Sequence, residues 1–146
     1  MEIWNEILGN QVLVCSVAGW TVAQVLKTII DVVLNRSFNP ERLFGSGGMP
    51  SSHSATVCAL TTASGLKYGV GSFEFAISFV VAMVVMYDAM GVRREAGRHA
   101  KAINELLEML SSEQEPEAKL KEFLGHSPLQ VCCGAVLGLA VACALG

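Results

Sequence analysis

Four long stretches without a charged side chain limit how this chain can fold. Counting histidine as neutral, they run over residues 7–26, 43–66, 75–87 and 123–146. Roughly 20 apolar residues cross a bilayer as a helix. The first and last stretches are long enough to do so alone, and the middle two are long enough when their flanking residues are included. We therefore predict an all-α fold, an integral membrane bundle of about four transmembrane helices. Because the second stretch is only weakly apolar, a soluble helical bundle is the alternative.

Glycines, prolines and polar residues set the expected helix bounds. The spans are expected over about 7–34, 51 to between 67 and 71, 73–91, and 127 to the end. Residues 92–112 carry apolar side chains at three- and four-residue steps, which predicts an amphipathic interfacial helix at the lipid headgroups. Residues 111–121 read as a polar linker. The length of 146 residues predicts a single domain over 1–146.

Net charge, the positions of basic residues and the cysteines further limit the class of protein. A net charge of −3 argues against a nucleic-acid partner. Basic residues gather in loops 35–52 and 91–127, which lie on the same side of a four-span protein, and the positive-inside rule places that side in the cytoplasm. The 5 cysteines lie in apolar stretches without zinc-type spacing, so we expect small core residues rather than disulfides.

Residues 47–55 form a helix start suited to an anion. Glycines precede Pro50, and Ser51 and Ser52 then open a helix whose first backbone N–H groups point at one spot. His53 stands at the same spot and can exchange a proton near neutral pH. Taken alone, the stretch also fits a capped helix with an incidental histidine.

A second helix start follows the polar linker. His126 precedes Ser127 as N-cap, Pro128 at the first helical position and Gln130 in a capping box. Beyond it, small residues repeat every four positions, at Gly134, Gly138, Ala142 and Gly146. Such a strip allows another helix to pack closely against this one, either within the monomer or across a homodimer.

One membrane face thus collects groups suited to phosphoryl transfer. The two histidine-bearing helix starts lie there, together with Arg93, Arg94 and, at the end of the third span, Asp88. Arginine matches phosphate oxygens, and paired histidines can act as nucleophile and acid. Lys27, inside the first span, either faces a polar cavity or reaches the headgroups with its tip. A headgroup-binding surface without catalysis is the alternative.

These motifs resemble the phosphatidic acid phosphatase type 2 superfamily, which also includes vanadium haloperoxidases. Residues 50–53, Pro-Ser-Ser-His, look like its Pro-Ser-Gly-His motif, and His126, Pro128 and Gly134 repeat the spacing of its last motif. Residues 47–55, 86–94 and 125–128 are more similar still to the divergent branch of that superfamily. The resemblance covers nearly the whole chain.

The resemblance implies a role for each candidate residue. His126 would be the nucleophile that forms a phosphohistidine, and His53 the general acid. Phosphate oxygens would be bound by the helix start and by cations, namely Ser51, Ser52, Lys27, Arg93 and Arg94. No metal or cofactor is implied, because protein cations and N–H groups neutralise the phosphate. The substrate would be a lipid or isoprenoid phosphomonoester held in the lipid bilayer.

Three features depart from the superfamily pattern: no Ser-Arg pair stands just before His126, Lys27 lacks the expected Arg-Pro partner, and position 130 differs. Gln130 stands where the superfamily has an aspartate that orients the nucleophilic histidine. An amide oxygen accepts an imidazole N–H but does not offset an imidazolium charge, and losing such a carboxylate costs about 10⁴ in rate in serine proteases. Asp88 is a second candidate for this orienting role. The departure supports an alternative function, a non-catalytic lipid-phosphate-binding or membrane assembly protein that retains the shape of the site.

Overall fold

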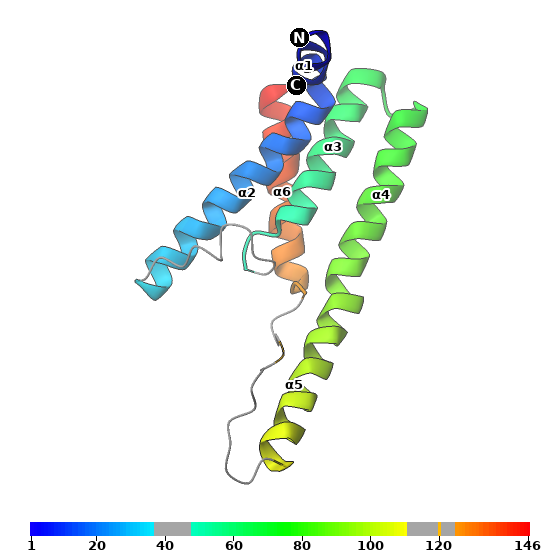
Figure 1. Ribbon diagram of the computed structural model, residues 1–146. Helices are drawn as coiled ribbons and strands as arrows, with labels where there is room; N and C mark the ends of the chain where they lie inside the picture. The colour runs from blue at the N-terminus through cyan, green and yellow to red at the C-terminus, as the bar shows by residue number, and fades with distance from the viewer. Residues whose placement is uncertain (37–47, 111–119, 121–124) are drawn as a thin grey trace.

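The computed structural model describes residues 1–36, 48–110, 120 and 125–146, except for the side chains of Arg93, Arg94 and Leu110. These residues form the helices α1 (Glu2–Gly9), α2 (Gln11–Asn35), α3 (Ser52–Tyr68), α4 (Phe73–Met90), α5 (Val92–Leu110) and α6 (Pro128–Leu145). The predicted all-α bundle is confirmed. Both termini lie at one end of it, and the starts of α3 and α6 face the other end (Figure 1). Most of the expected linker over 111–121 lies outside the described residues.

Helix α3 is the centre of the bundle, in contact with α2, α4 and α6. Its buried face is made of small residues, among them Ala55 and Ala59, both fully buried. On α6, a Cβ added to Gly138 would overlap the Ala55 carbonyl oxygen, and on α2 one added to Gly19 would stand 3.0 Å from the same atom. The three backbones therefore approach closely because side chains are missing at the crossings. The glycine strip of α6 is used within the chain.

Three helices among the described residues are long and apolar enough to cross a membrane: Gln11–Asn35, Phe73–Met109 and Pro128–Leu145. α3, with 17 residues and many hydroxyls, is not one of them. Several of its hydroxyls bond within the protein: Ser54 Oγ donates to Ser51 Oγ at 3.0 Å, and Thr56 Oγ1 donates to the Ser52 carbonyl oxygen at 2.7 Å. Since α3 packs on helices rather than lipid, its polar groups do not have to face hydrocarbon. A bundle of about four helices therefore agrees with the prediction.

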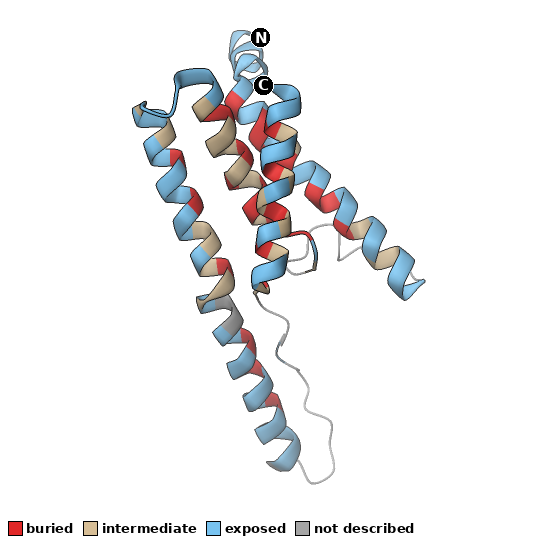
Figure 2. Ribbon diagram, turned by 180° about the vertical axis from the view of Figure 1, so that it is seen from behind, coloured by how far each residue is buried: buried red, intermediate tan, exposed pale blue. Residues whose placement is uncertain are grey.

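Burial separates the inner and outer faces of the bundle. Buried residues follow the inward sides of the helices, and the outward sides are exposed (Figure 2). Those outward sides are apolar, with Val80 and Val84 of α4 and Val136 of α6 each more than half exposed. An apolar exterior around a core of small and polar residues is the pattern expected when the surrounding medium is lipid.

The first span begins later than predicted. The Asn10 side chain accepts a 3.3 Å hydrogen bond from the Leu13 backbone N–H, which makes Asn10 the N-cap of α2. This cap separates α2 from the short α1, so the helix starts at Gln11 rather than near residue 7. The apolar pattern alone ran through this boundary because α1 is itself apolar on one side.

The amphipathic helix expected over 92–112 is present as α5. It continues the direction of α4 beyond the end of the bundle (Figure 1), with Gly91 at the junction. Its buried side includes Ala100 and Asn104. The Asn104 side chain holds both backbone groups of Leu120, through hydrogen bonds of 2.9 and 3.0 Å. One face of α5 thus contacts Leu120, in the segment that precedes α6.

The cysteine prediction is correct in part. All five are free thiols, and Cys15 is buried in the core. Cys132 and Cys143 are exposed on α6, so the expectation of core positions was wrong for these two. A thiol behaves as a small hydrophobe, and therefore suits a lipid-facing surface as well as a core.

Candidate functional site at the histidine end of the bundle

The structure brings His53 and His126 side by side. Their ring centroids are 6.1 Å apart, and the ring planes are inclined at 58°. His53 is half-buried in the first turn of α3, whereas His126, just before α6, is only 3% exposed. Two imidazoles at this separation are close enough to contact a single tetrahedral anion.

Backbone hydrogen bonds hold the helix ends that carry the pair. The Ser51 N–H donates to the Gln130 carbonyl oxygen at 3.1 Å, and the His126 N–H donates to the Ala89 carbonyl oxygen at 3.0 Å. The start of α3, the start of α6 and the end of α4 are therefore tied together. These two bonds join the three helix ends directly.

Ser51 is the N-cap of α3 and is fully buried. Its Oγ accepts from the Ser54 N–H at 3.3 Å and from the Ser54 hydroxyl at 3.0 Å. The capping role occupies this hydroxyl oxygen. Ser52 is also buried, with 4% of its surface exposed. Contact between this segment and an anion would therefore come from first-turn backbone N–H groups, as at other helix starts.

The Gln130 side chain sets the tautomer of His126. Gln130 Oε1 accepts from the Ser127 N–H at 3.0 Å within the capping box, which identifies this atom as the amide oxygen. The same oxygen lies 3.3 Å from His126 Nδ1. An amide oxygen only accepts, so Nδ1 is the donor in this hydrogen bond, and in the neutral ring Nε2 then keeps its lone pair. A nucleophilic histidine needs this tautomer.

Lys27 lies inside the bundle, only 3% exposed, so of the two alternatives for this residue the interior position is the one observed. Its Nζ donates to Gln24 Oε1 at 2.7 Å, and its alkyl chain packs under Gly48, just before the α3 start. The loop that leads into Ser51 therefore lies on top of the lysine. A buried ammonium is unfavourable unless partners or an anion compensate its charge.

Gln24 is the residue of this site that sequence reasoning missed. It is 7% exposed and lies one turn before Lys27 on the same face of α2. The available signal was its spacing of three residues from an intramembrane lysine, which places two polar side chains together on an otherwise apolar helix.

The other predicted site residues lie near the end of α4. Asp88 is half-buried and directly precedes Ala89, which accepts the His126 N–H. Arg93 and Arg94 lie in the first turn of α5, but their side chains are outside the described residues. Of the two orienting candidates, Gln130 lies beside the His126 ring, and the orienting role of Asp88 stays a prediction. The phosphate-binding role of the arginines stays a prediction.

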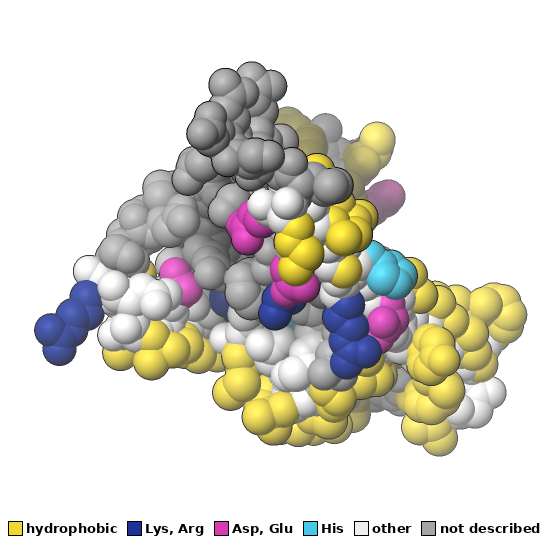
Figure 3. All heavy atoms as spheres, turned by 90° about the horizontal axis from the view of Figure 1, so that it is seen from below, with side chains coloured by type: hydrophobic (Ala, Val, Ile, Leu, Met, Phe, Trp, Pro, Cys, Tyr) yellow, Lys and Arg dark blue, Asp and Glu magenta, His cyan; other side chains and the backbone are white. Residues whose placement is uncertain are grey.

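Seen from the end to which α5 projects, the described surface has a polar middle and an apolar edge. Lysine, arginine, aspartate and glutamate side chains gather in the middle, and hydrophobic side chains surround much of them (Figure 3). A charged end bordered by apolar helix sides fits a bundle whose end reaches the headgroup level.

A bundle of apolar helices with two histidines and a buried lysine gathered at one end defines a PAP2-like membrane protein. The model of the Divergent PAP2 family matches residues 8–141, and the chain belongs to that family. It is also 40% identical to the uncharacterized membrane protein YuiD of Bacillus subtilis (strain 168), over 92% of each chain. No solved structure matches it.

Proposed function

We propose that this protein hydrolyses a phosphomonoester carried by a lipid or isoprenoid, through a phosphohistidine intermediate. The observation that supports this best is the 6.1 Å separation of the His53 and His126 rings. Two imidazoles from separate helix starts then flank one position, with the Lys27 stem beneath the adjoining loop.

In the first step, the Nε2 lone pair of His126 attacks phosphorus. The N–P bond forms as the bond from phosphorus to the lipid oxygen breaks. His53, in its protonated form, gives its proton to the leaving alkoxide, so that the lipid alcohol departs neutral.

In the second step, a water molecule attacks the phosphohistidine. His53, now neutral, takes a proton from that water, and the new O–P bond forms as the N–P bond breaks. Inorganic phosphate leaves, and both histidines return to their starting protonation states. The same residue therefore acts as acid and then as base.

Cations and helix N–H groups would stabilise the charge on the phosphoryl oxygens. Lys27 is already buried beside the loop before α3, and a fixed cation in a site of low dielectric strengthens this interaction. Arg93 and Arg94 begin the helix that follows α4 and would supply bidentate contacts. Protein groups alone thus provide the positive charge, and the proposal invokes no metal or cofactor.

The membrane orientation belongs to the same proposal. The ends of α2 and α4 and the starts of α3 and α6 lie at the histidine end (Figure 1). The stretches 35–52 and 91–127, which connect these helix ends in the sequence, carry most of the basic residues. By the positive-inside rule this end faces the cytoplasm, and the substrate phosphate would be presented from the inner leaflet.

One observation favours a second function. Gln130, an amide, lies beside His126 Nδ1 in place of a carboxylate, so no negative charge at this contact offsets an imidazolium. Under this second reading, the site binds a lipid phosphate and does not hydrolyse it. The second candidate is therefore a non-catalytic lipid-phosphate-binding or membrane assembly protein, and a homodimer would suit that role.

Phosphate release from detergent-solubilised lipid phosphates separates the two candidates. We expect release by the wild type, loss of release in His126→Ala and His53→Ala, and inhibition by vanadate, which mimics five-coordinate phosphorus. His99→Ala is the matched control, because His99 is exposed on α5. Equal release by all four proteins would exclude the proposed chemistry. Binding of lipid phosphate without release would establish the second candidate.

A further inference from the structure

Helix α1 has an apolar side that no other described helix covers. Its large apolar residues follow the three- and four-residue steps of one helix face: Ile3, Trp4, Ile7 and Leu8. Each of these four side chains is at least 40% exposed. The polar residues of α1 lie on the opposite face. Among the described helices, α1 contacts only α2, which directly follows it.

The apolar face of α1 adjoins a surface that contacts lipid. Helix α2 is long and apolar enough to cross a membrane, and Leu13, Val14 and Val17 near its start are exposed. Only Asn10 separates α1 from this helix. The backbone of Asn10 is not helical, with a φ of −80° and a ψ of 89°, so the chain changes direction there. Helix α1 is therefore a separate element, joined to α2 at the level where the membrane span begins.

Exposed aromatic side chains lie at the same end of the bundle. Both termini are found there, at the end where a short turn joins α3 to α4 (Figure 1). Tyr68 ends α3 and Phe73 begins α4, and both are exposed, as is Trp4. Tryptophan and tyrosine gather at membrane–water interfaces, because their rings are apolar and carry a polar group. These residues place α1 at the level of the lipid headgroups.

The charges of α1 indicate which kind of lipid surface it fits. Glu2 and Glu6 are its only charged side chains, and it contains no lysine or arginine. Interfacial helices that bind anionic lipids carry basic residues on the polar face. An acidic polar face is repelled by an anionic surface but is compatible with neutral or zwitterionic headgroups. Binding must therefore be driven by burial of the apolar face.

We propose that α1 lies in the plane of the bilayer surface opposite the histidine end. Its apolar face is buried at the boundary between the headgroups and acyl chains of neutral or zwitterionic lipids, and its glutamates face water. The partner of this surface is the lipid itself. Because Asn10 joins α1 directly to α2, the helix fixes the level at which the first span enters the bilayer.

The chain contains two tryptophans, which allow a direct measurement of depth. Trp20→Phe leaves Trp4 as the single tryptophan. Trp4→Phe leaves Trp20, which lies on α2 about 15 Å beyond Asn10 along the helix and thus well inside the hydrocarbon. Both variants, as full chains, are reconstituted in phosphatidylcholine vesicles. Lipids brominated close to the glycerol or at the chain end quench tryptophan fluorescence at two depths, and iodide reports access from water.

We expect bromine close to the glycerol to quench Trp4 most, with little quenching by chain-end bromine or by iodide. Trp20 should be quenched most by chain-end bromine. In the Trp20→Phe background, Leu8→Asn should lower lipid quenching of Trp4 and raise iodide quenching, because it places an amide on the apolar face. Glu6→Gln, on the polar face, is the matched control and should change neither. Adding phosphatidylglycerol at a constant level of brominated lipid should not increase the quenching.

Three results would overturn the proposal. Strong iodide quenching of Trp4 with weak lipid quenching would show that α1 projects into water. Weak quenching by all three agents would show that protein covers the apolar face, as in a contact between two copies. Strongest quenching by chain-end bromine would place α1 inside the bilayer. If Trp20→Phe fails to fold, as judged by thermal unfolding, the difference between wild type and Trp4→Phe isolates the Trp4 signal. None of these measurements depends on phosphate release.

Discussion

Gly48 lies directly over the side chain of Lys27. A Cβ added to Gly48 would stand 3.2 Å from Lys27 Cγ and 3.4 Å from Cδ, and the φ of Gly48 is +84°. The glycine therefore serves two purposes, because it adopts a left-handed backbone and leaves room for the lysine stem. The loop before α3 and the buried cation of α2 are positioned together.

Gly48→Ala should consequently impair both folding and anion binding. The left-handed backbone costs about 1–2 kcal/mol for an L-residue, and the new methyl group should displace the lysine. Gly69→Ala is the matched control, because Gly69 has a φ of +85° but nothing within 4 Å. Thermal unfolding should show destabilisation in both variants, and vanadate affinity should fall only in Gly48→Ala. Equal vanadate affinity in both would show that the Lys27 position does not matter.

Lys27→Met tests the cation itself. Methionine keeps an unbranched stem of similar length and removes the charge, so the variant should fold. A charged hydrogen bond contributes about 1.5–3 kcal/mol, so vanadate affinity should fall about ten- to a hundredfold. The control is Lys67→Met, since Lys67 is exposed at the opposite end of α3. Unchanged affinity in Lys27→Met would remove this lysine from the site.

Gln130→Glu should raise the rate of hydrolysis. Glutamate has the same length, keeps the capping box with Ser127 and places a carboxylate beside His126 Nδ1. That carboxylate offsets the imidazolium charge. In serine proteases, removing the corresponding carboxylate lowers the rate by about 10⁴. We expect an increase in kcat of at least about tenfold in the phosphate-release assay. A slower enzyme would mean that the amide is the preferred partner of this histidine.

Gly138→Ala should destabilise the bundle, although alanine normally favours a helix by up to about 1 kcal/mol over glycine. The added methyl would overlap the Ala55 carbonyl oxygen and force α6 away from α3. Overpacking of this kind costs about 1–3 kcal/mol, and sometimes more. Gly9→Ala, at the end of α1 with nothing within 4 Å, is the control. Chemical denaturation should show a lower free energy of unfolding than wild type for Gly138→Ala and an unchanged one for Gly9→Ala.

Much of the fold was readable from the sequence because its signals are local. The uncharged stretches, the N-caps at Ser51 and Ser127, and the capping box with Gln130 each depend on residues within one or two helical turns. The amphipathic pattern of α5 is local in the same sense. The break at Asn10 was missed because a single capping side chain outweighed an apolar pattern that continues on both sides of it.

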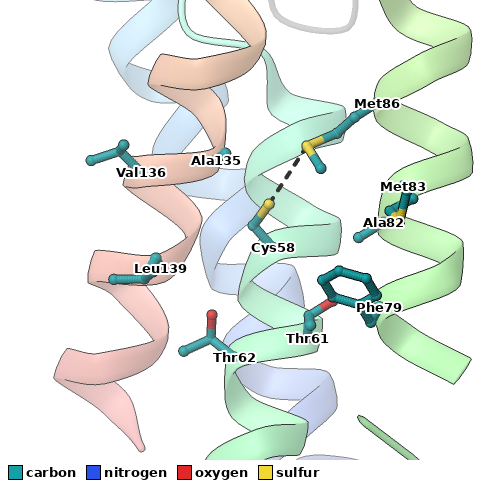
Figure 4. Close-up of a pocket in the computed structure, with 10 residues that line it drawn as sticks. All are labelled: Cys58, Thr61, Thr62, Phe79, Ala82, Met83, Met86, Ala135, Val136 and Leu139. Carbon is teal, nitrogen blue, oxygen red and sulfur yellow. Dashed lines mark hydrogen bonds between the residues drawn. The ribbon is translucent and has the colours of Figure 1, made fainter. Parts of the chain in front are cut away.

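The site was predictable only as a set of residues, because its geometry depends on packing between distant segments. The family motifs named His53 and His126, but their 6.1 Å separation follows from how α3 and α6 pack. The Gln24 contact to Lys27 was hidden because no motif includes it. A cavity lined by Cys58, Met86 and Leu139 (Figure 4) could not be predicted, since it arises where α4 and α6 contact each other little.

The short, hydroxyl-rich α3 also has a consequence for how the protein enters the bilayer. Three other helices have the length and apolarity to insert independently, and α3 does not. Only a short turn at 69–72 separates it from the strongly apolar α4. The translocon should therefore release α3 into lipid as one arm of a helical hairpin, carried by its neighbour. The helix that bears His53 acquires its transmembrane position from the helix that follows it in synthesis.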